Sequence, residues 1–217
     1  MFGSTPAGRS VEVANVQTTS QPRWFLRAPS RDVVAEFLAA QENVPVSYAD
    51  VGASQGASPV GFNLDHNRLQ IGRGEGDFAT ACEALRGWRM FPSSWTKISP
   101  EAAPFCEGVV VAMQAHALGV WWLNACRIVY LVHDDIAVRR IGFAYGTLPA
   151  HVEEGEERFS VELQPDGTVW YDIRAFSRPR YWPVRLAKPL ARRLQRRFVR
   201  ESQQAMLDAV ARGGRAT

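Results

Sequence analysis

The feature that most constrains the fold is a series of strand-like segments that follow one another without a helix between them. Between Gly108 and Ser177, five such segments of 8 to 11 residues are separated by short turn sequences, of which "QPDGT" is the clearest hairpin turn. Consecutive strands without crossover helices pair in antiparallel order. The sequence therefore predicts an antiparallel meander, with strands at 108–118, 126–135, 139–148, 157–164 and 168–177.

One long amphipathic helix is predicted after the strands, over roughly residues 181–212. Pro189 fits the first turn of its main part, because a proline there removes no intrahelical hydrogen bond. A long antiparallel sheet needs its apolar face covered, and this helix supplies a matching stripe. At 100° per residue the stripe contains Ala187, Leu190, Ala191, Leu194, Phe198 and Ala205, and the opposite side contains Arg185, Arg192, Arg193, Arg196 and Arg200.

Before the meander, the sequence predicts two helices and one strand. Ser30 can cap a helix over 31–41, and a strand over 62–72 leads through "GRGEGDF" into a helix over 77–88. The glycine spacing fits neither phosphate-binding motif, so no nucleotide site is expected. Residues 1–21 are polar without periodicity and are predicted to be a disordered tail. The remaining 22–212 are predicted to form a single α+β domain.

Composition narrows the class of protein. Of the 217 residues, 46% are hydrophobic and 22% are charged, which is typical of a globular protein and not of a disordered one. No apolar run of membrane-spanning length and no secretory signal is present, so a cytoplasmic location is expected. Cys82, Cys106 and Cys126 lack paired spacing, which favours core thiols over disulfides or a zinc site.

Charge is unevenly spread along the chain. From Arg174 onward there are 12 of the 25 basic and 2 of the 22 acidic residues, so this end carries +10 and the rest −7. An arginine-rich helix face is often only solvated or paired with acidic loops. Among functional interpretations, transient contact with an anionic membrane is favoured over nucleic acid, because no base-reading module is present. A protein-interaction module acting through the arginine face is a further alternative.

A histidine and four carboxylates gather between two predicted strands, at His151, Glu153, Glu154, Glu156 and Glu157. The favoured interpretation is a solvated acidic bend that pairs with arginines, and the alternative is a metal site. Adjacent glutamates in a strand point to opposite faces, and no calcium-loop spacing is present. We therefore expect neither a bound metal nor a cofactor.

Five longer motifs carry a family resemblance: "IGRGEGDF", "RGWRMFPSSW", "WWLNACRIVYLV", "GFAYGTLPAHVEEGEERF" and "VWYDIRAFSRP". With them the chain, from roughly Val46 to the end of the terminal helix, resembles an uncharacterised family of bacteria and plants known only as a domain of unknown function. That family resembles the START-like, helix-grip superfamily. The resemblance implies a curved antiparallel sheet wrapped around a long C-terminal helix, with a cavity for apolar ligands between them. It implies no reaction and therefore no catalytic residue.

The predicted function is binding or carriage of a small apolar or amphipathic molecule in this cavity. The alternative is a cyclase-like or hydrolase-like enzyme that uses the same cavity, with Tyr145, Tyr171 and Glu201 as acids or bases. Polar tips on an apolar strand face can orient a ligand, or they can simply find partners in a closed core. The candidate ligand-binding residues are Phe143, Tyr145, Thr147, Tyr171, Ile173, Ala191, Leu194, Phe198 and Glu201.

Two further expectations concern charged side chains. Glu201 falls within the apolar stripe of the terminal helix, where it either pairs with Arg197 four residues earlier or faces the cavity with a raised pKa; the pair is favoured. On the last strand, aromatic and charged residues alternate on the face away from the predicted cavity, which predicts an exposed surface or edge. These residues are Trp170, Asp172, Arg174, Phe176 and Arg178.

Overall fold

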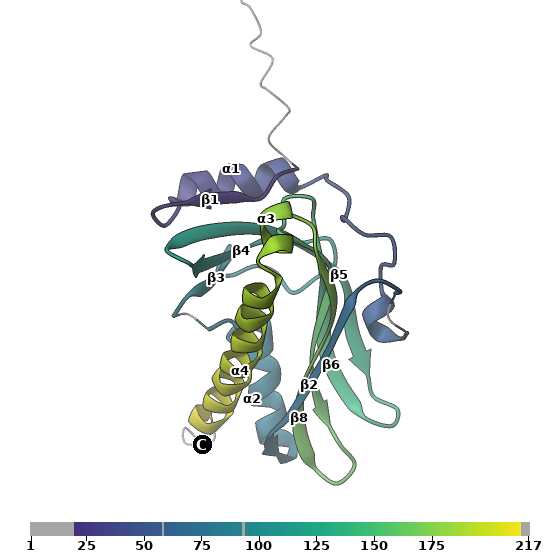
Figure 1. The fold of residues 1–217 in the computed structure, drawn as a ribbon. Helices are drawn as coiled ribbons and strands as arrows, with labels where there is room; N and C mark the ends of the chain where they lie inside the picture. Colours follow the sequence, from purple (N-terminus) through teal and green to yellow (C-terminus); the bar gives the residue numbers. More distant parts are fainter. Residues whose placement is uncertain (1–19, 58, 93, 214–217) are drawn as a thin grey trace, which may run out of the picture.

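The computed structural model describes residues 20–57, 59–92 and 94–213, so the predicted tail at 1–21 lies almost wholly outside the described residues. Figure 1 shows the order of the elements along the chain. The elements are β1 (Arg23–Phe25), α1 (Arg31–Gln41), η2 (Ala53–Gln55), β2 (Asn63–Arg73), α2 (Gly74–Arg86), β3 (Thr96–Ser99), β4 (Val110–Ala117), β5 (Val120–Asp134), β6 (Arg139–Thr147), β7 (Glu153–Leu163), β8 (Thr168–Pro179), α3 (Trp182–Leu186) and α4 (Lys188–Gly213).

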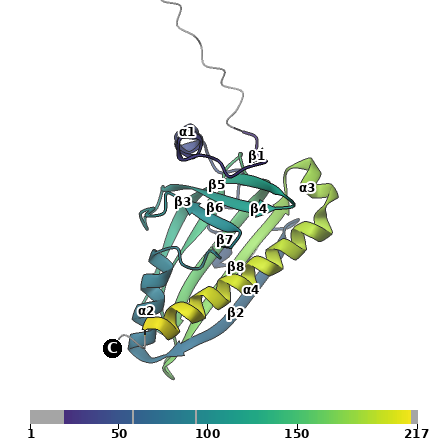
Figure 2. The ribbon, with the colours of Figure 1, turned by 90° about the vertical axis from the view of Figure 1, so that its left-hand side faces the viewer.

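The strands form one curved antiparallel sheet. Its order is β2-β8-β7-β6-β5-β4-β3, and β1 pairs with β5 off this path. Helix α4 crosses the hollow side of the sheet, and α2 lies beside its C-terminal part (Figures 1 and 2). The predicted α+β helix-grip fold, with a meander followed by one long helix, is confirmed.

Two boundaries differ from the predicted ones for physical reasons. Strand β5 begins at Val120, because Leu118 and Gly119 adopt positive φ angles and form a tight turn directly after β4. Strand β7 begins at Glu153, four residues earlier than predicted, and pairs with β8 as far as Pro179. The predicted acidic bend is therefore part of a strand, and its carboxylates alternate between the two faces of the sheet.

The glycine-rich segment before α2 has a structural role. Gly74 adopts a φ of +81° and its N–H donates to the carbonyl oxygen of Gly167 at 2.7 Å, which ties the start of α2 to the β7–β8 turn. Helix α2 starts at Gly74, three residues earlier than predicted, and Asp77 supports this start by accepting a hydrogen bond from the Arg73 N–H at 2.8 Å. Ser30 likewise caps α1 through the Val33 N–H at 3.3 Å.

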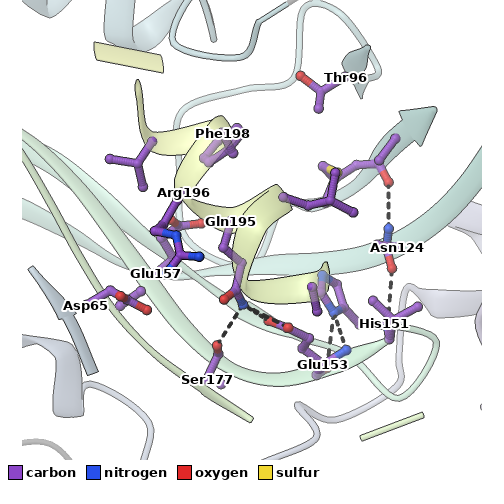
Figure 3. Close-up of a pocket in the computed structure, with 18 of the residues that line it drawn as sticks. Asp65, Thr96, Asn124, His151, Glu153, Glu157, Ser177, Gln195, Arg196 and Phe198 are labelled. Atoms are coloured by element: carbon purple, nitrogen blue, oxygen red, sulfur yellow. Dashed lines mark hydrogen bonds between the residues drawn. The ribbon is translucent and has the colours of Figure 1, made fainter. Parts of the chain in front are cut away.

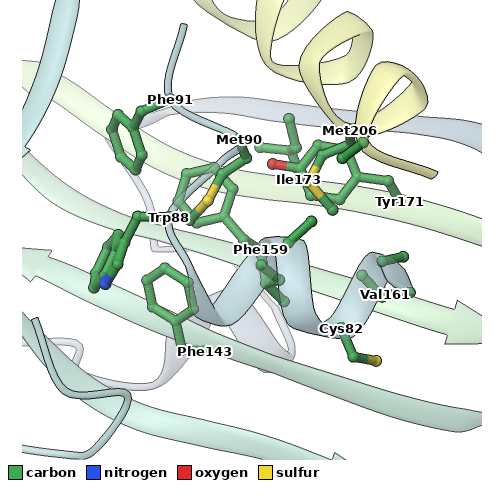
Figure 4. Packing of buried hydrophobic residues seen from close by; sticks show 14 of the residues in the cluster. Cys82, Trp88, Met90, Phe91, Phe143, Phe159, Val161, Tyr171, Ile173 and Met206 are labelled. Atoms are coloured by element: carbon green, nitrogen blue, oxygen red, sulfur yellow. The ribbon is translucent and has the colours of Figure 1, made fainter. Parts of the chain in front are cut away.

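The two halves of α4 differ in how closely they pack against the main core. In the C-terminal half, Met206 and Ala209 pack with Tyr171 and Ile173 of β8 and with α2 in one buried cluster (Figure 4). All buried residues of α4, which are Ser202, Met206, Ala209 and Val210, lie in this half. The N-terminal half has no buried residue, and it contacts the sheet through the ring of Phe198, which lies against Phe159 of β7.

The outer face of β8 is more covered than predicted. Phe176 is buried, because the segment from Val44 to Phe62 folds back over it and places the rings of Tyr48 and Phe62 against it. Asp172 is also buried, between His66 and Arg158, at 2.5 and 3.0 Å. The prediction of an exposed surface was wrong for these two residues. The core-thiol prediction holds for Cys82 and Cys126 but not for the exposed Cys106.

Candidate functional site

A cavity of about 640 Å³ lies between the sheet and the first half of α4 (Figure 3). This volume lies in the range of small-molecule binding sites. Its helix side is largely apolar, with Leu190, Ala191, Leu194 and Phe198 among the lining residues. Leu118 of the β4–β5 turn also lines the cavity and is 66% exposed, so the cavity reaches the surface there, next to the lining residues Pro183 and Val184 of α3.

Six of the nine predicted ligand-binding residues line this cavity. They are Tyr145, Thr147 and Ile173 from the sheet and Ala191, Leu194 and Phe198 from α4.

The other three predicted residues lie outside the cavity lining. Phe143 packs against Trp88 and Phe159 in the aromatic core. Tyr171 is fully buried, and its hydroxyl shares a 2.9 Å hydrogen bond with the Ser202 hydroxyl. The hydroxyl of Tyr171 thus has a core partner, which was the alternative to the cavity interpretation.

Glu201 forms the favoured ion pair. Arg197 Nε donates to it at 2.7 Å, and so does Trp95 Nε1 at 2.7 Å. Burial acts to raise its pKa, but these hydrogen bonds outweigh that effect and hold the pKa of Glu201 below its usual value. The alternative of a raised pKa is contradicted. Of the three residues considered as an acid or base for an enzyme, Tyr145 alone lines the cavity.

Glu157, which the sequence analysis assigned to a solvated bend, lines the cavity. Its side chain lies on the cavity wall, where the Tyr145 hydroxyl donates to it at 2.7 Å. Burial raises the pKa of Glu157 to about 7, partly offset by the Tyr145 hydrogen bond and reinforced by the charges of Glu153 and Asp65. The sequence contained a signal for this position. Alternate residues of a strand face the same side, so Glu157 faces the same side as the inward-facing Phe159 and Val161.

Glu153 and Asp65 are two further carboxylates among the lining residues, and both have partners from α4. Gln195 Nε2 donates to both oxygens of Glu153 at 2.8 and 2.7 Å (Figure 3). Burial raises the pKa of Glu153, and hydrogen bonds from Ser177 and Gln195 partly offset this. Arg192 binds Asp65 through two nitrogens at 2.5 and 2.7 Å. Arg192 therefore ties α4 to β2 and is not part of a free arginine face.

His151 closes the end of the cavity near β7. Burial lowers its pKa to about 4, so the imidazole is neutral around pH 7. Its Nδ1 lies 2.9 Å from the backbone nitrogen and 3.1 Å from the carbonyl oxygen of Glu153. His151 thus shapes the wall as a neutral group.

Glu156 faces the opposite side of the sheet and is only 2% exposed. It accepts hydrogen bonds from the Tyr48 hydroxyl at 2.8 Å, the Gly52 N–H at 2.8 Å and the Ser54 N–H at 3.0 Å. A side chain at Gly146 would come within 2.2 Å of the Tyr48 hydroxyl, so a glycine is needed there. The prediction of a solvated acidic bend was wrong for Glu156, which anchors the 47–56 segment on the outer face of the sheet. The predicted pairing with an arginine is confirmed for Glu154, which binds Arg178.

Within the part of the chain that the structure describes, no group of three or more metal-ligating side chains lies close enough to hold an ion. The expectation that no metal binds stays a prediction. No helix among the described residues is both long and apolar enough to cross a membrane.

The comparison with protein families identifies the motifs quoted above. Residues 47–205 match the family described as "Domain of unknown function (DUF1990)". The chain belongs to this family. The resemblance inferred from the five motifs is thereby confirmed, and the family description assigns no activity.

Relatives in this family come from distant organisms. A "UPF0548 protein" of Deinococcus radiodurans is 35% identical over 197 residues, which cover 86% of this chain and 98% of the relative. A "UPF0548 protein" of Dictyostelium discoideum is 37% identical over 158 residues, covering 69% of this chain and 73% of the relative. Members of the DUF1990 family are therefore not confined to bacteria.

Solved structures with a related arrangement are distant in sequence. A hypothetical protein of Helicobacter pylori has a TM-score of 0.45 and 16% identity, covering 68% of this chain and 85% of that chain. The di-domain ARO/CYC StfQ from the steffimycin biosynthetic pathway has a TM-score of 0.48 and 13% identity, covering 70% of this chain and 52% of that chain. At this level of similarity no activity transfers to this DUF1990 member.

Proposed function

We propose that the chain binds a small apolar or amphipathic molecule in the cavity beneath α4. The observation that carries the proposal is the contrast within one helix: its C-terminal half is packed into the core, and its N-terminal half leaves about 640 Å³ against the sheet. A helix that served only to complete a core would gain free energy by closing this space. The part of the apolar stripe from Leu190 to Phe198 then serves the ligand as well as the sheet.

A binding titration tests this proposal. The uncharged fluorophore N-phenylnaphthylamine should show a saturable rise in emission, with a dissociation constant on the order of micromolar. Decanol should displace it, because an uncharged apolar chain fills the same space. Emission that never saturates, or that decanol leaves unchanged, would contradict the proposal.

The matched control addresses binding to the surface. Val60 and Ile136 are almost fully exposed apolar residues that do not line the cavity. A variant with Val60→Ser and Ile136→Ser should bind the fluorophore as tightly as the unmodified protein. Loss of the signal in this variant would assign the binding to the surface.

The mouth of the cavity also suits transient contact with an anionic membrane, from which an apolar ligand could be collected. Leu118, Trp182 and Leu186 are 66%, 66% and 77% exposed near it, although large apolar side chains gain free energy on leaving water. Exposed basic side chains follow along α3 and α4, and opposite charge attracts them to an anionic surface. These basic residues are Arg185, Arg193, Arg196 and Arg200.

A triple variant tests the membrane contact. Changing Arg193, Arg196 and Arg200 to Gln should abolish salt-sensitive binding to vesicles of anionic lipid, measured by co-sedimentation. Because these three side chains are exposed, the melting temperature should stay nearly unchanged, with less than about 0.5 kcal/mol of effect at each site. Equal vesicle binding by both proteins would remove the membrane contact from the account.

A further inference from the structure

Glu157 differs from the other carboxylates of the cavity wall in what surrounds it. Asp65 is held by the Arg192 guanidinium and Glu153 by the Gln195 amide. The hydrogen-bond partner of Glu157 is the neutral Tyr145 hydroxyl, which donates to Oε2. Among the described residues nothing donates to Glu157 Oε1, and no arginine, lysine or histidine forms an ion pair with this carboxylate.

Among the described residues, no basic side chain around this part of the cavity pairs with Glu157. Arg192 of α4 is bound to Asp65. Arg196 and Arg200 line the cavity from α4, but both side chains are exposed, and neither forms an ion pair with Glu157 among the described residues. His151 is neutral around pH 7 because burial lowers its pKa. Glu157 therefore has a carboxylate oxygen, Oε1, that can accept a hydrogen bond from a ligand.

We propose that the ligand of this cavity is an apolar molecule carrying a protonated amine, and that the ammonium group binds the carboxylate of Glu157. This inference rests on the proposed function, since it specifies the class of ligand for the same cavity. A partly buried carboxylate such as Glu157 gains most from a cationic donor, which supplies both the hydrogen bond and the opposite charge. The Tyr145 hydrogen bond holds the carboxylate in position, with Oε1 left for the ligand.

The other carboxylates of the cavity wall favour a positively charged ligand over a negatively charged one. Asp65, Glu153 and Glu157 all lie on the sheet side, whereas α4 contributes apolar residues together with the exposed Arg196 and Arg200. A ligand carboxylate placed beside these groups would be repelled, and it would add a further buried anion. An uncharged alcohol could donate one hydrogen bond to Glu157 but would leave its charge uncompensated.

The test is a competition series at pH 8 with ligands that share one chain and differ in the head group. Decylamine, decanol and decanoate each displace N-phenylnaphthylamine from the cavity, at concentrations below their critical micelle concentrations. Decylamine should bind at least about tenfold more tightly than decanol, because a charge-assisted hydrogen bond is stronger than a neutral one. Decanoate should bind most weakly of the three.

Variants assign the preference to one carboxylate. Glu157→Gln should remove the preference for decylamine and leave decanol binding in place. Glu154→Gln is the matched control on the same strand, since Glu154 pairs with Arg178 on the outer face, and it should keep the whole series unchanged. Tyr145→Phe should also keep the preference at high pH, because it leaves the carboxylate intact.

The pH dependence gives a second readout. Since burial places the pKa of Glu157 near 7, the carboxylate is ionised at pH 8 and protonated at pH 5. Decylamine is an alkyl ammonium like lysine, with a pKa of about 10.4, and stays charged throughout. The preference for decylamine over decanol should therefore fall as the pH drops from 8 to 5.

Folding of the key variant can be checked independently. The folded pKa of Glu157, about 7, lies above its ordinary value of 4.5, so the contribution of this group to stability is fully present below pH 4.5 and is lost as the pH rises through 7. Glu157→Gln should then melt at or above the temperature of the unmodified protein at pH 8.

The outcomes separate the two proposals. An amine preference that survives in Glu157→Gln, or its absence from the unmodified protein while decanol binds, overturns the assignment of the amine to Glu157. If neither the fluorophore nor decanol binds at all, the cavity proposal itself fails.

Discussion

Replacing Glu156 with glutamine is expected to lower the free energy of unfolding by about 2–4 kcal/mol. The carboxylate accepts hydrogen bonds from Tyr48, Gly52 and Ser54 in a nearly water-free position on the outer face of the sheet. A glutamine amide would present N–H groups to these donors, so at least one buried N–H or O–H would lose its partner. Urea denaturation at pH 7 measures the change.

The control for Glu156 is the same substitution two residues earlier. Glu154→Gln removes an ion pair with Arg178, whose side chain is half exposed, so it should change stability by less than about 1 kcal/mol. If the two variants had equal stability, the 47–56 segment would not be anchored through Glu156.

The second large effect is expected from two alanines on one helix. Ala191 lines the cavity, so Ala191→Trp should fill it, abolish uptake of N-phenylnaphthylamine and leave the melting temperature nearly unchanged. Ala209 is 1% exposed in the core against α2 and the sheet. Ala209→Trp should therefore overpack the core and cost about 1–3 kcal/mol or more. Thermal unfolding and probe titration on both variants measure the contrast.

Equal destabilisation by the two tryptophans would mean that the N-terminal half of α4 packs as tightly as the C-terminal half. In that case the space beneath Ala191 would be too small for a ligand. Full probe uptake by Ala191→Trp would instead place the bound probe elsewhere.

The sheet and the terminal helix could be predicted from the sequence, because both depend on local periodicity. The alternation from Glu157 to Leu163 is strand-like on its own, and the stripe from Leu190 to Phe198 has helical spacing. The start of β7 could not be predicted in this way. Glu153, Glu154 and Glu156 are polar. A run of polar residues is typical of a loop unless the partners of these residues are known.

Those partners are distant in the sequence. Glu156 is buried by a segment about 100 residues earlier, and Arg192 is bound by Asp65, which is 127 residues away. Neither contact leaves a periodic signal along the chain. The same reason explains why Phe176 was predicted to be exposed, since the covering Tyr48 and Phe62 belong to that early segment.

The cavity itself was predicted through the family resemblance and not from the stripe of α4. Small residues such as Ala187 and Ala191 fit equally well against a closely packed sheet and above an open space. The difference lies in how far the helix stands from the sheet. The contacts that hold the helix there, from Arg192 to Asp65 and from Gln195 to Glu153, join residues far apart in the sequence.

The most direct measurement of the central claim is an isotope-filtered NOE experiment on methyl-labelled protein with bound decanol. The account predicts intermolecular NOEs from the decanol chain to the methyl groups of Leu190 and Leu194, which line the cavity. It predicts none to Val60 or Ile136, which are almost fully exposed on the surface. NOEs confined to the surface methyl groups, with none to Leu190 or Leu194, would contradict a ligand-binding cavity beneath α4.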